Sequence, residues 1–401
     1  MSKPHLSSND QNPVVAISDV LVEKEQIAVQ SQWHLIRSRF AKHRLAVLAL
    51  YTIGFLYFLA LFAPFFTPYS QNTRSVEYSY APPQIPSFNF SEGFYVDAIK
   101  SRKDPVTLRK YYVTDTAEKV PLGFFVKGES YRAFWIIRSD RHFFGVNLEK
   151  WKRLTEASDL SIESEEVTPP SFHLLGADQY GRDVFSRVVF GSRISLSIGL
   201  VSIAMTFILG SLIGGISGYV GGTVDTLIQR LIEIINSFPH LPLWMAIAAI
   251  VPAGWPPLRV YFAITIVLSF LNWTGLARVV RGKILSLREE EYAVAARLLG
   301  ASHGRVLFRH LLPGFTSHII VTLTLSVPGM ILGETALSFL GIGLRPPIVS
   351  WGVMLQDCLN LQVVADYPWH LLPVIMIIIT VLSFNFLGDG MRDAADPYSV
   401  K

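Results

Sequence analysis

Two carboxylates lie inside long apolar runs, and they are the residues of this sequence best placed to do chemistry. Glu233 and Glu334 are the two. Ionisable groups within membrane-spanning segments are costly and often functional, so we consider both as residues of a translocation path. Phe238, in the Ser-Phe-Pro break after Glu233, is a third candidate. The alternative is that each carboxylate reaches an interface at the end of its run.

Other kinds of chemistry have no support in the sequence. The phosphate-binding pattern Gly-x-x-x-x-Gly-Lys-Ser/Thr does not occur, and the Gly-rich stretch 218–222 lacks the lysine that such a loop needs. His-Glu-x-x-His is also absent. Cys358 is the only cysteine, which excludes an intrachain disulfide and a cysteine-rich metal site. We therefore expect no metal, no cofactor and no catalytic residue.

The composition indicates a polytopic membrane protein. Half of the 401 residues are hydrophobic and 16% are charged, against about 25% in a soluble chain. The net charge of +4 is small, so nucleic acid is not an expected partner. About 20 apolar residues cross a bilayer. Six runs meet that length: Leu45–Phe66, Ile194–Ser217, Leu227–Val251, Val260–Val280, Phe315–Leu332 and Trp369–Leu387.

The basic residues set the expected orientation. Lys and Arg gather before the first run and between the fourth and fifth, which places these segments and both termini in the cytoplasm. Residues 67–173 then form a long outer loop. Its aromatic and β-branched runs, such as Tyr131–Ile137, favour a small unit containing β-strands. We expect this insert to contact an external partner. A proton- or sodium-coupled carrier usually keeps several carboxylates near the membrane midplane, and none is expected there.

The basic segment 281–313 has the pattern of two short helices. Lys283–Leu299 favours one helix, which Gly300 ends. Ser302 can cap a second helix to about Arg309, and Pro313 then ends the unit. A DNA-reading helix pair is excluded because both ends are tethered to the bilayer. The two remaining interpretations are a solvated loop that satisfies the positive-inside rule and a docking element for a cytosolic partner.

Several motifs resemble those of ABC importer permeases for dipeptides, oligopeptides and nickel. Ala295-Ala296, then Gly300, then Leu312-Pro313 resembles the coupling loop of that family, although Val294 stands where the family often has Glu. The stretch from His173 to Asp183 resembles the segment before the second span. Leu337–Gly343 and Asn385–Asp393 resemble the end of the fifth span and the C-terminal end. The enlarged outer loop is similar to that of microcin C-type permeases.

The resemblance implies an all-α fold of six transmembrane helices of the type I ABC importer kind, with a small α+β or β insert outside. The expected parts are a tail at 1–44, a first helix at 45–66, the insert at 67–173, a core at 174–391 and a tail at 392–401. The coupling loop would contact an ATPase through Glu291, Tyr292, Ala295, Ala296, Arg297, Gly300, Ala301, Leu312 and Pro313. An outer scoop would contain Pro346, Pro347, Ser350, Trp351 and Gly352.

The same resemblance implies the function and the partners. The chain would be the permease subunit of an ATP-driven importer of peptides or peptide-like solutes in the cytoplasmic membrane, without enzymatic activity of its own. Its partners would be a second, non-identical permease, two ATPase subunits, a solute-binding protein and membrane lipid. Nickel chelates, oligosaccharides or opines are alternative solutes, and an ion-coupled secondary transporter is the alternative mechanism.

Overall fold

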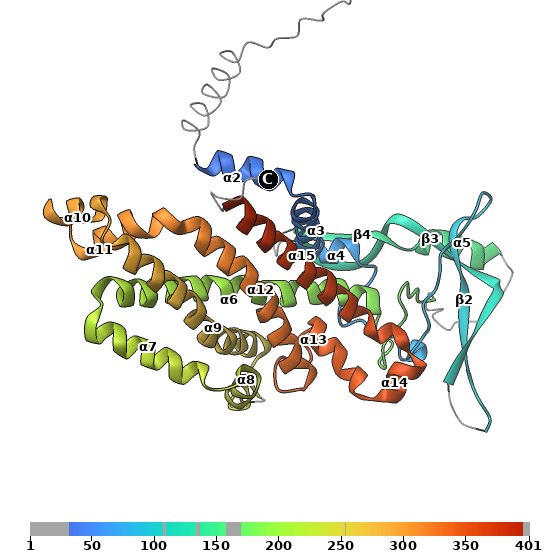
Figure 1. Cartoon of the computed structure of the whole chain (residues 1–401). Helices are drawn as coiled ribbons and strands as arrows, with labels where there is room; N and C mark the ends of the chain where they lie inside the picture. The colour runs from blue at the N-terminus through green and yellow to red at the C-terminus, as the bar shows by residue number, and fades with distance from the viewer. Residues whose placement is uncertain (1–31, 107–109, 134–136, 158–169, 253, 396–401) are drawn as a thin grey trace, which may run out of the picture.

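The computed structural model describes residues 32–106, 110–133, 137–157, 170–252 and 254–395. The outer parts of the two expected tails and the apolar stretch 134–136 lie outside the described residues. A helical bundle forms most of the described chain, and a four-stranded sheet with one helix stands at one end of it (Figure 1). The sheet is at the opposite end from α10 and α11, as the expected orientation requires.

Five helical stretches are long and apolar enough to cross a membrane, and a bent pair makes up to six. This agrees with the expected six spans. The helices are α3 (Arg44–Leu61), α6 (Val184–Val220), the pair α7 (Gly222–Asn236) and α8 (His240–Ala248), α9 (Pro257–Leu287), α12 (Thr316–Phe339) and α15 (Leu372–Ala395). Shorter helices are α2 (Gln32–Lys42), α4 (Ala63–Phe66), α5 (Leu148–Ala157), α10 (Glu291–Leu298), α11 (His303–Arg305), α13 (Trp351–Met354) and α14 (Leu361–Asp366).

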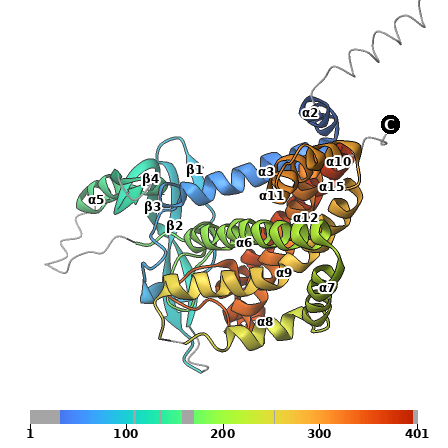
Figure 2. The same ribbon diagram turned by 90° about the vertical axis from the view of Figure 1, so that its left-hand side faces the viewer.

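The third expected span is broken rather than continuous. Its two halves, α7 and α8, are bent by 85° at the Ser237–Pro239 break. Pro239 is extended and stands at the N-cap of α8, so it starts a new helix with a ring that could not continue the old one. The break that the sequence predicted is therefore a sharp change of direction (Figure 2).

Close packing of α6 on α9 forms the centre of the bundle. A Cβ on Gly214 would lie 2.3 Å from the Ala277 carbonyl oxygen, and one on Gly210 would meet Leu276 at 2.8 Å. Only glycine permits this approach of two helix backbones. Further along α9, Ile264 and Leu268 belong to the largest apolar cluster of the described residues, together with side chains from α6, α8 and α12.

The insert between α4 and α6 is an antiparallel sheet in the order β1-β2-β3-β4. The strands are β1 (Ser87–Asn89), β2 (Gly93–Lys103), β3 (Lys110–Ala133) and β4 (Ile137–Val146). The long strand β3 pairs with β2 through its first half and with β4 through its second half. Val96, Val120 and Phe172 form its small core. The α5 helix follows β4, so the insert is an α+β unit.

Candidate functional site

The segment between α9 and α12 folds differently from the expected pair of helices. One helix was expected over Lys283–Leu299, but α9 ends at Leu287 and α10 begins at Glu291. Glu289, Glu290 and Glu291 explain the interruption, because acids are unfavourable at the C-terminus of a helix and favourable at the N-terminus of the next. The segment therefore contains one more break than the sequence indicated, in addition to the expected one at Gly300.

The second half of this segment also differs from expectation. Pro313 does not end a separate helix. From His303 the chain stays helical to Phe339, through a π-helical stretch (Val306–Leu311) and a 3₁₀ turn (Leu312–Phe315) that leads into α12. Pro313 lies in the first turn of the 3₁₀ stretch, where its missing N–H leaves no bond unmade. This half of the segment is therefore continuous with α12.

The turn between the two halves has the predicted geometry. Gly300 has a φ of +82°, which glycine adopts without penalty. The Ser302 hydroxyl accepts a hydrogen bond from the Arg305 N–H at 3.4 Å and caps α11. Both features were predicted from the local sequence, and both are confirmed.

The predicted coupling residues divide into two groups. Ala296, Ala301 and Leu312 pack against an apolar cluster around Ile284, Ala293, Val306 and Leu311. The other six are exposed: Glu291, Tyr292, Ala295, Arg297, Gly300 and Pro313.

The most exposed apolar side chains of the segment were not predicted. Leu298 is 83% exposed and Leu299 is 88% exposed, at the tip of α10. Two leucines directly before the helix-ending glycine, off the apolar stripe of their helix, are the signal that could have revealed them. An exposed apolar pair at the end of a membrane bundle indicates a contact with another protein.

Arginine side chains tie this segment to the ends of neighbouring helices. The Arg288 guanidinium donates to the Gly218 and Tyr219 carbonyl oxygens at 3.1 and 3.4 Å, and Arg297 donates to the Arg288 carbonyl oxygen at 2.9 Å. The Tyr219 hydroxyl lies 3.0 Å from His303 Nδ1. The α10–α11 tip is therefore joined to the last turn of α6.

A second polar connection joins α9 to α7. Arg281 of α9 binds Asp225 of α7 through two nitrogen–oxygen contacts of 2.5 Å each. Such a paired geometry between guanidinium and carboxylate is the strongest and most directional kind of ion pair. Together these bonds join α10 and α11 to the ends of α6 and α9, and join α9 to α7.

Glu334 occupies a position that the sequence did not indicate. Its side chain is fully buried rather than at an interface. Its Oε1 accepts hydrogen bonds from the Ser338 and Ser350 hydroxyls at 2.8 and 2.7 Å, and its Oε2 accepts one from the Ser195 hydroxyl at 3.4 Å. The carboxyl group thus joins α12, α6 and the start of α13.

Each of these hydroxyls in turn accepts a backbone N–H from the loop after α12 or from α13. Leu344 donates to Ser338, Trp351 donates to Ser195, and Val353 donates to Ser350, at 3.0–3.1 Å. Three hydrogen-bond chains, each from a backbone N–H through a serine hydroxyl, therefore end on the Glu334 carboxyl group. Hydrogen bonds in such chains strengthen one another. Glu334 consequently acts as an anchor for the predicted scoop, and this position does not support a lining role in an open path.

The other scoop residues lie close to this anchor. Ser350 caps α13, and Trp351 is fully buried, with its indole N–H donating to the Val188 carbonyl oxygen at 3.0 Å. Gly352 permits close contact, because a Cβ there would lie 2.8 Å from Thr335 Cα. Pro346 and Pro347 line a cavity of about 210 Å³ that the scoop forms with the loop before α9.

Glu233 and Phe238 lie on the outside of the bundle. The Glu233 carboxylate pairs with Arg230 at 2.7 Å and stays largely exposed, and Phe238 is exposed at the α7–α8 bend. They border an exposed apolar stripe of α7 with helical spacing, formed by Val224, Leu227, Leu231 and Ile234. The structure therefore does not bring them together with Glu334.

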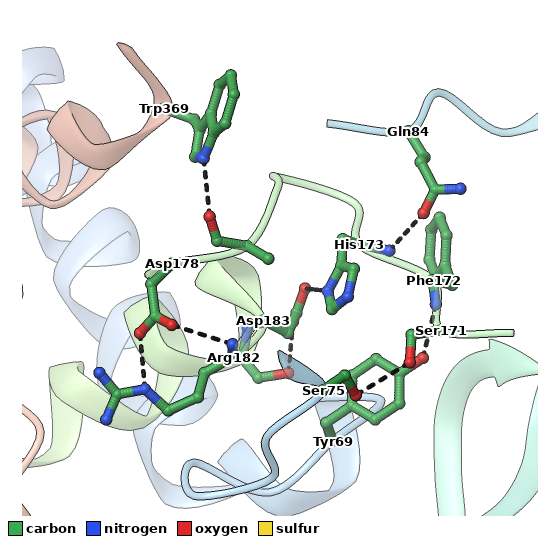
Figure 3. Close-up of polar contacts among 12 residues, drawn as sticks. Tyr69, Ser75, Gln84, Ser171, Phe172, His173, Asp178, Arg182, Asp183 and Trp369 are labelled. Carbon is green, nitrogen blue, oxygen red and sulfur yellow. Dashed lines mark hydrogen bonds and ion pairs between the residues drawn. The ribbon is translucent and has the colours of Figure 1, made fainter. Parts of the chain in front are cut away.

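A buried polar network joins the insert to the bundle where α6 begins (Figure 3). Asp183 accepts the Ser186 N–H at 2.7 Å and caps α6, and its other oxygen lies 3.4 Å from His173 Nδ1. Asp178 binds the Arg182 side chain at 2.7 Å.

Three further hydrogen bonds extend this network into the insert and the bundle. The Gln84 side chain accepts the His173 N–H at 2.8 Å, and the Tyr69 hydroxyl accepts the Phe172 N–H at 2.8 Å. Burial raises the pKa of Tyr69, so its hydroxyl stays protonated. On the bundle side, Trp369 donates to the Ala177 carbonyl oxygen at 3.0 Å. The insert is therefore held to the spans by specific polar bonds.

Comparisons with known proteins agree with this architecture. Residues 210–399 match the family model of the binding-protein-dependent transport system inner membrane component. Residues 31–83 match that of the N-terminal transmembrane domain of oligopeptide transport permease C.

Among the similar proteins is the dipeptide transport system permease protein DppC of Bacillus subtilis, 37% identical over 59% of this chain and 72% of its own length. The oligopeptide permease protein OppC of the same species is 38% identical, over 60% of this chain and 76% of its own length. The glutathione transport system permease protein GsiD of Pectobacterium atrosepticum is 40% identical, over 57% and 74%. This chain is therefore a multi-pass inner-membrane protein that belongs to the family of peptide ABC importer permeases.

Proposed function

We propose that the chain carries peptides or peptide-like solutes inward by alternating access, driven by ATP hydrolysis in two partner ATPase subunits. The family assignment supports the transport role. The names of the relatives, which specify dipeptides, oligopeptides and glutathione, favour peptidic solutes over nickel chelates, oligosaccharides or opines. The likeness of the insert to microcin C-type permeases remains a prediction.

The observation that carries this proposal is the shape of the α10–α11 tip. Leu298 and Leu299 project from it, and its base is tied to three other helices. We propose that the two leucines enter a groove of an ATPase subunit, with the predicted residues Glu291, Tyr292, Ala295, Arg297 and Gly300 around them. Movement of the ATPase would then displace α10, and the apolar cluster around Ala293 would transmit that displacement to α9 and α12.

The outer surface of α7 favours a second permease as a neighbour. Its apolar stripe is flanked by the charged pair Arg230–Glu233, and such a pair is costly against acyl chains. We propose that a second, non-identical permease covers this face, so that Glu233 and Phe238 border the route between the two subunits. Crosslinking from Leu231→Cys, with exposed Leu200→Cys on α6 as the control, would test this arrangement.

The cavity beside the scoop favours an outer contact with a solute-binding protein. It opens between the loop before α9 and residues 342–348, at the end of the bundle where the insert lies. Glu334 holds this loop from inside the bundle, so the scoop would stay in place when a partner docks and leaves. We therefore assign the exposed scoop residues Pro346 and Pro347 to the binding-protein contact, with the buried Ser350, Trp351 and Gly352 holding them in place.

A reconstitution experiment tests the mechanism. The chain, its partner permease, the ATPases and the binding protein are placed in vesicles, and uptake of a labelled peptide is measured with internal or external ATP or with a proton or sodium gradient alone. We expect uptake only when ATP is on the ATPase side. Uptake driven by an ion gradient without ATP would instead establish the secondary-transporter alternative.

A further inference from the structure

A continuous band of phenylalanine rings crosses the surface from the first span to the far edge of the sheet. The aromatic band consists of Phe58, Phe66, Phe143, Phe124, Phe94, Phe88 and Phe90, in that order. The centroids of successive rings lie 4.9–5.7 Å apart. Most of these rings are exposed, and Phe90 is 98% exposed. A connected apolar surface of this extent on a folded unit indicates a binding surface.

The band continues a lipid-facing surface of the first span. Tyr51, Phe55 and Phe58 are exposed at positions four and three residues apart on α3, so they share one face of a helix that crosses the membrane. Phe58 is also the first ring of the band. The same apolar surface therefore passes from acyl-chain depth through α4 to the sheet without a polar interruption between its rings.

The β3–β4 hairpin adds positive charge beside the band. Two pairs of exposed cations stand directly opposite each other across its strands, Lys127 with Arg141 and Arg132 with Arg138. Like charges in directly opposed positions destabilise a hairpin. Anionic groups bound between such pairs would remove the repulsion, and phosphate groups suit arginine especially well.

The course of the hairpin brings these features to the bundle. Figure 1 shows β3 and β4 running from the sheet back towards α4 and the end of α3. Phe143 of β4 contacts both Phe65 and Phe66 of α4, which confirms that the hairpin lies beside the end of the first span. A membrane surface at that end would meet the aromatic band and the cation pairs together.

We propose that the insert rests on the outer leaflet of the membrane, with the aromatic band in the interface and the hairpin cations on the phosphates of anionic phospholipids. Apolar aromatic side chains with adjacent Lys and Arg are the combination by which surface elements bind anionic membranes. This contact holds the insert beside the spans at a fixed height. The opposite side of the insert remains available to a soluble partner.

Fluorescence quenching in vesicles tests the proposal. An environment-sensitive fluorophore is attached to Phe124→Cys or Phe90→Cys in a Cys358→Ser background, and the assembled transporter is reconstituted. Ser101→Cys is the matched control, because Ser101 is exposed on β2 seven residues beyond Phe94, roughly 23 Å along the strand. The vesicles contain phosphatidylcholine with or without phosphatidylglycerol. Acyl-chain spin labels and aqueous iodide serve as the two quenchers.

The proposal predicts opposite behaviour at the two kinds of position. Probes at 124 and 90 should lose most of their emission to the lipid quencher and resist iodide, whereas the probe at 101 should do the reverse. Phosphatidylglycerol should increase lipid quenching at 124, and the double variant Lys127→Glu, Arg141→Glu should abolish that increase. Because Phe90 is almost fully exposed, its replacement should not disturb folding, and an unchanged melting temperature verifies this.

Three outcomes would overturn the proposal in whole or in part. Probes at 124 and 90 that behave like the probe at 101 would show that the band stands in water. Shielding that appears only after the solute-binding protein is added would assign the band to that protein instead of to lipid. Quenching that is equal with and without phosphatidylglycerol would refute the role given to the hairpin cations.

Discussion

The carboxyl group of Glu334 offers the sharpest test of how the outer loop is held. We predict that Glu334→Ala opens the loop between α12 and α13 without removing any other side chain of the network. The substitution leaves the hydroxyls of Ser195, Ser338 and Ser350 without their shared acceptor inside the bundle. A buried polar group that loses its partner costs about 1–3 kcal/mol.

Three such losses give a cost of about 3 kcal/mol at the low end of that range. That free energy corresponds to roughly a 150-fold larger population of the open loop. Glu334→Gln is the matched control, since its volume is nearly the same and its oxygen still accepts from Ser338 and Ser350. Only the hydrogen bond from Ser195 is lost, so the expected cost is about 1 kcal/mol. That free energy corresponds to a roughly fivefold larger population of the open loop.

Cysteine labelling measures this opening. Val349 is 3% exposed and packs against Val184 and Val188, so a cysteine there reacts only when the loop opens. The labelling rate of Val349→Cys in a Cys358→Ser background should rise most with Glu334→Ala and slightly with Glu334→Gln. Equal rates in the parent and in Glu334→Ala would refute the anchor, as would equal rates in the two Glu334 variants.

Three further predictions address the coupling segment and the outer end. Gly300→Val should destabilise the turn by about 1–2 kcal/mol, because a β-branched residue resists the positive φ of this position. Gly300→Asn should be tolerated better. Recovery of the ATPases in pull-downs measures the effect, and normal recovery with the valine variant would contradict the prediction. The double variant Leu298→Asp, Leu299→Asp should abolish peptide-stimulated ATP hydrolysis at an unchanged melting temperature, since both side chains are exposed; a lower melting temperature would indicate a packing role. Burial, and next the Asp178 carboxylate, raises the pKa of Asp357. Because the folded state holds the Asp357 proton more tightly than the unfolded state does, this group stabilises the folded state at pH values below its unfolded pKa. That stabilisation is lost as the pH rises through its folded pKa. The melting temperature should thus fall over that interval, and Asp357→Asn should flatten the fall; an unchanged profile would exclude Asp357 as its cause.

Local sequence was sufficient wherever a structural feature depends on neighbouring residues. The apolar runs predicted the spans because each run must satisfy its own backbone within the bilayer. Pro239 predicted the break in the third span, and Gly300 with Ser302 predicted the turn and cap of the coupling segment. The basic segment and the aromatic outer loop likewise predicted that the α10–α11 tip and the sheet lie at opposite ends of the bundle.

The tertiary structure decided the features that depend on distant partners. Glu334 appears in the sequence as one acid near the end of a span, and its role depends on serines brought together from α6, α12 and the outer loop. The aromatic band is also invisible in sequence, because its rings come from two helices and four strands. A span can be predicted from the chemistry of its own residues, but a buried carboxyl group acquires its function from the donors that folding places around it.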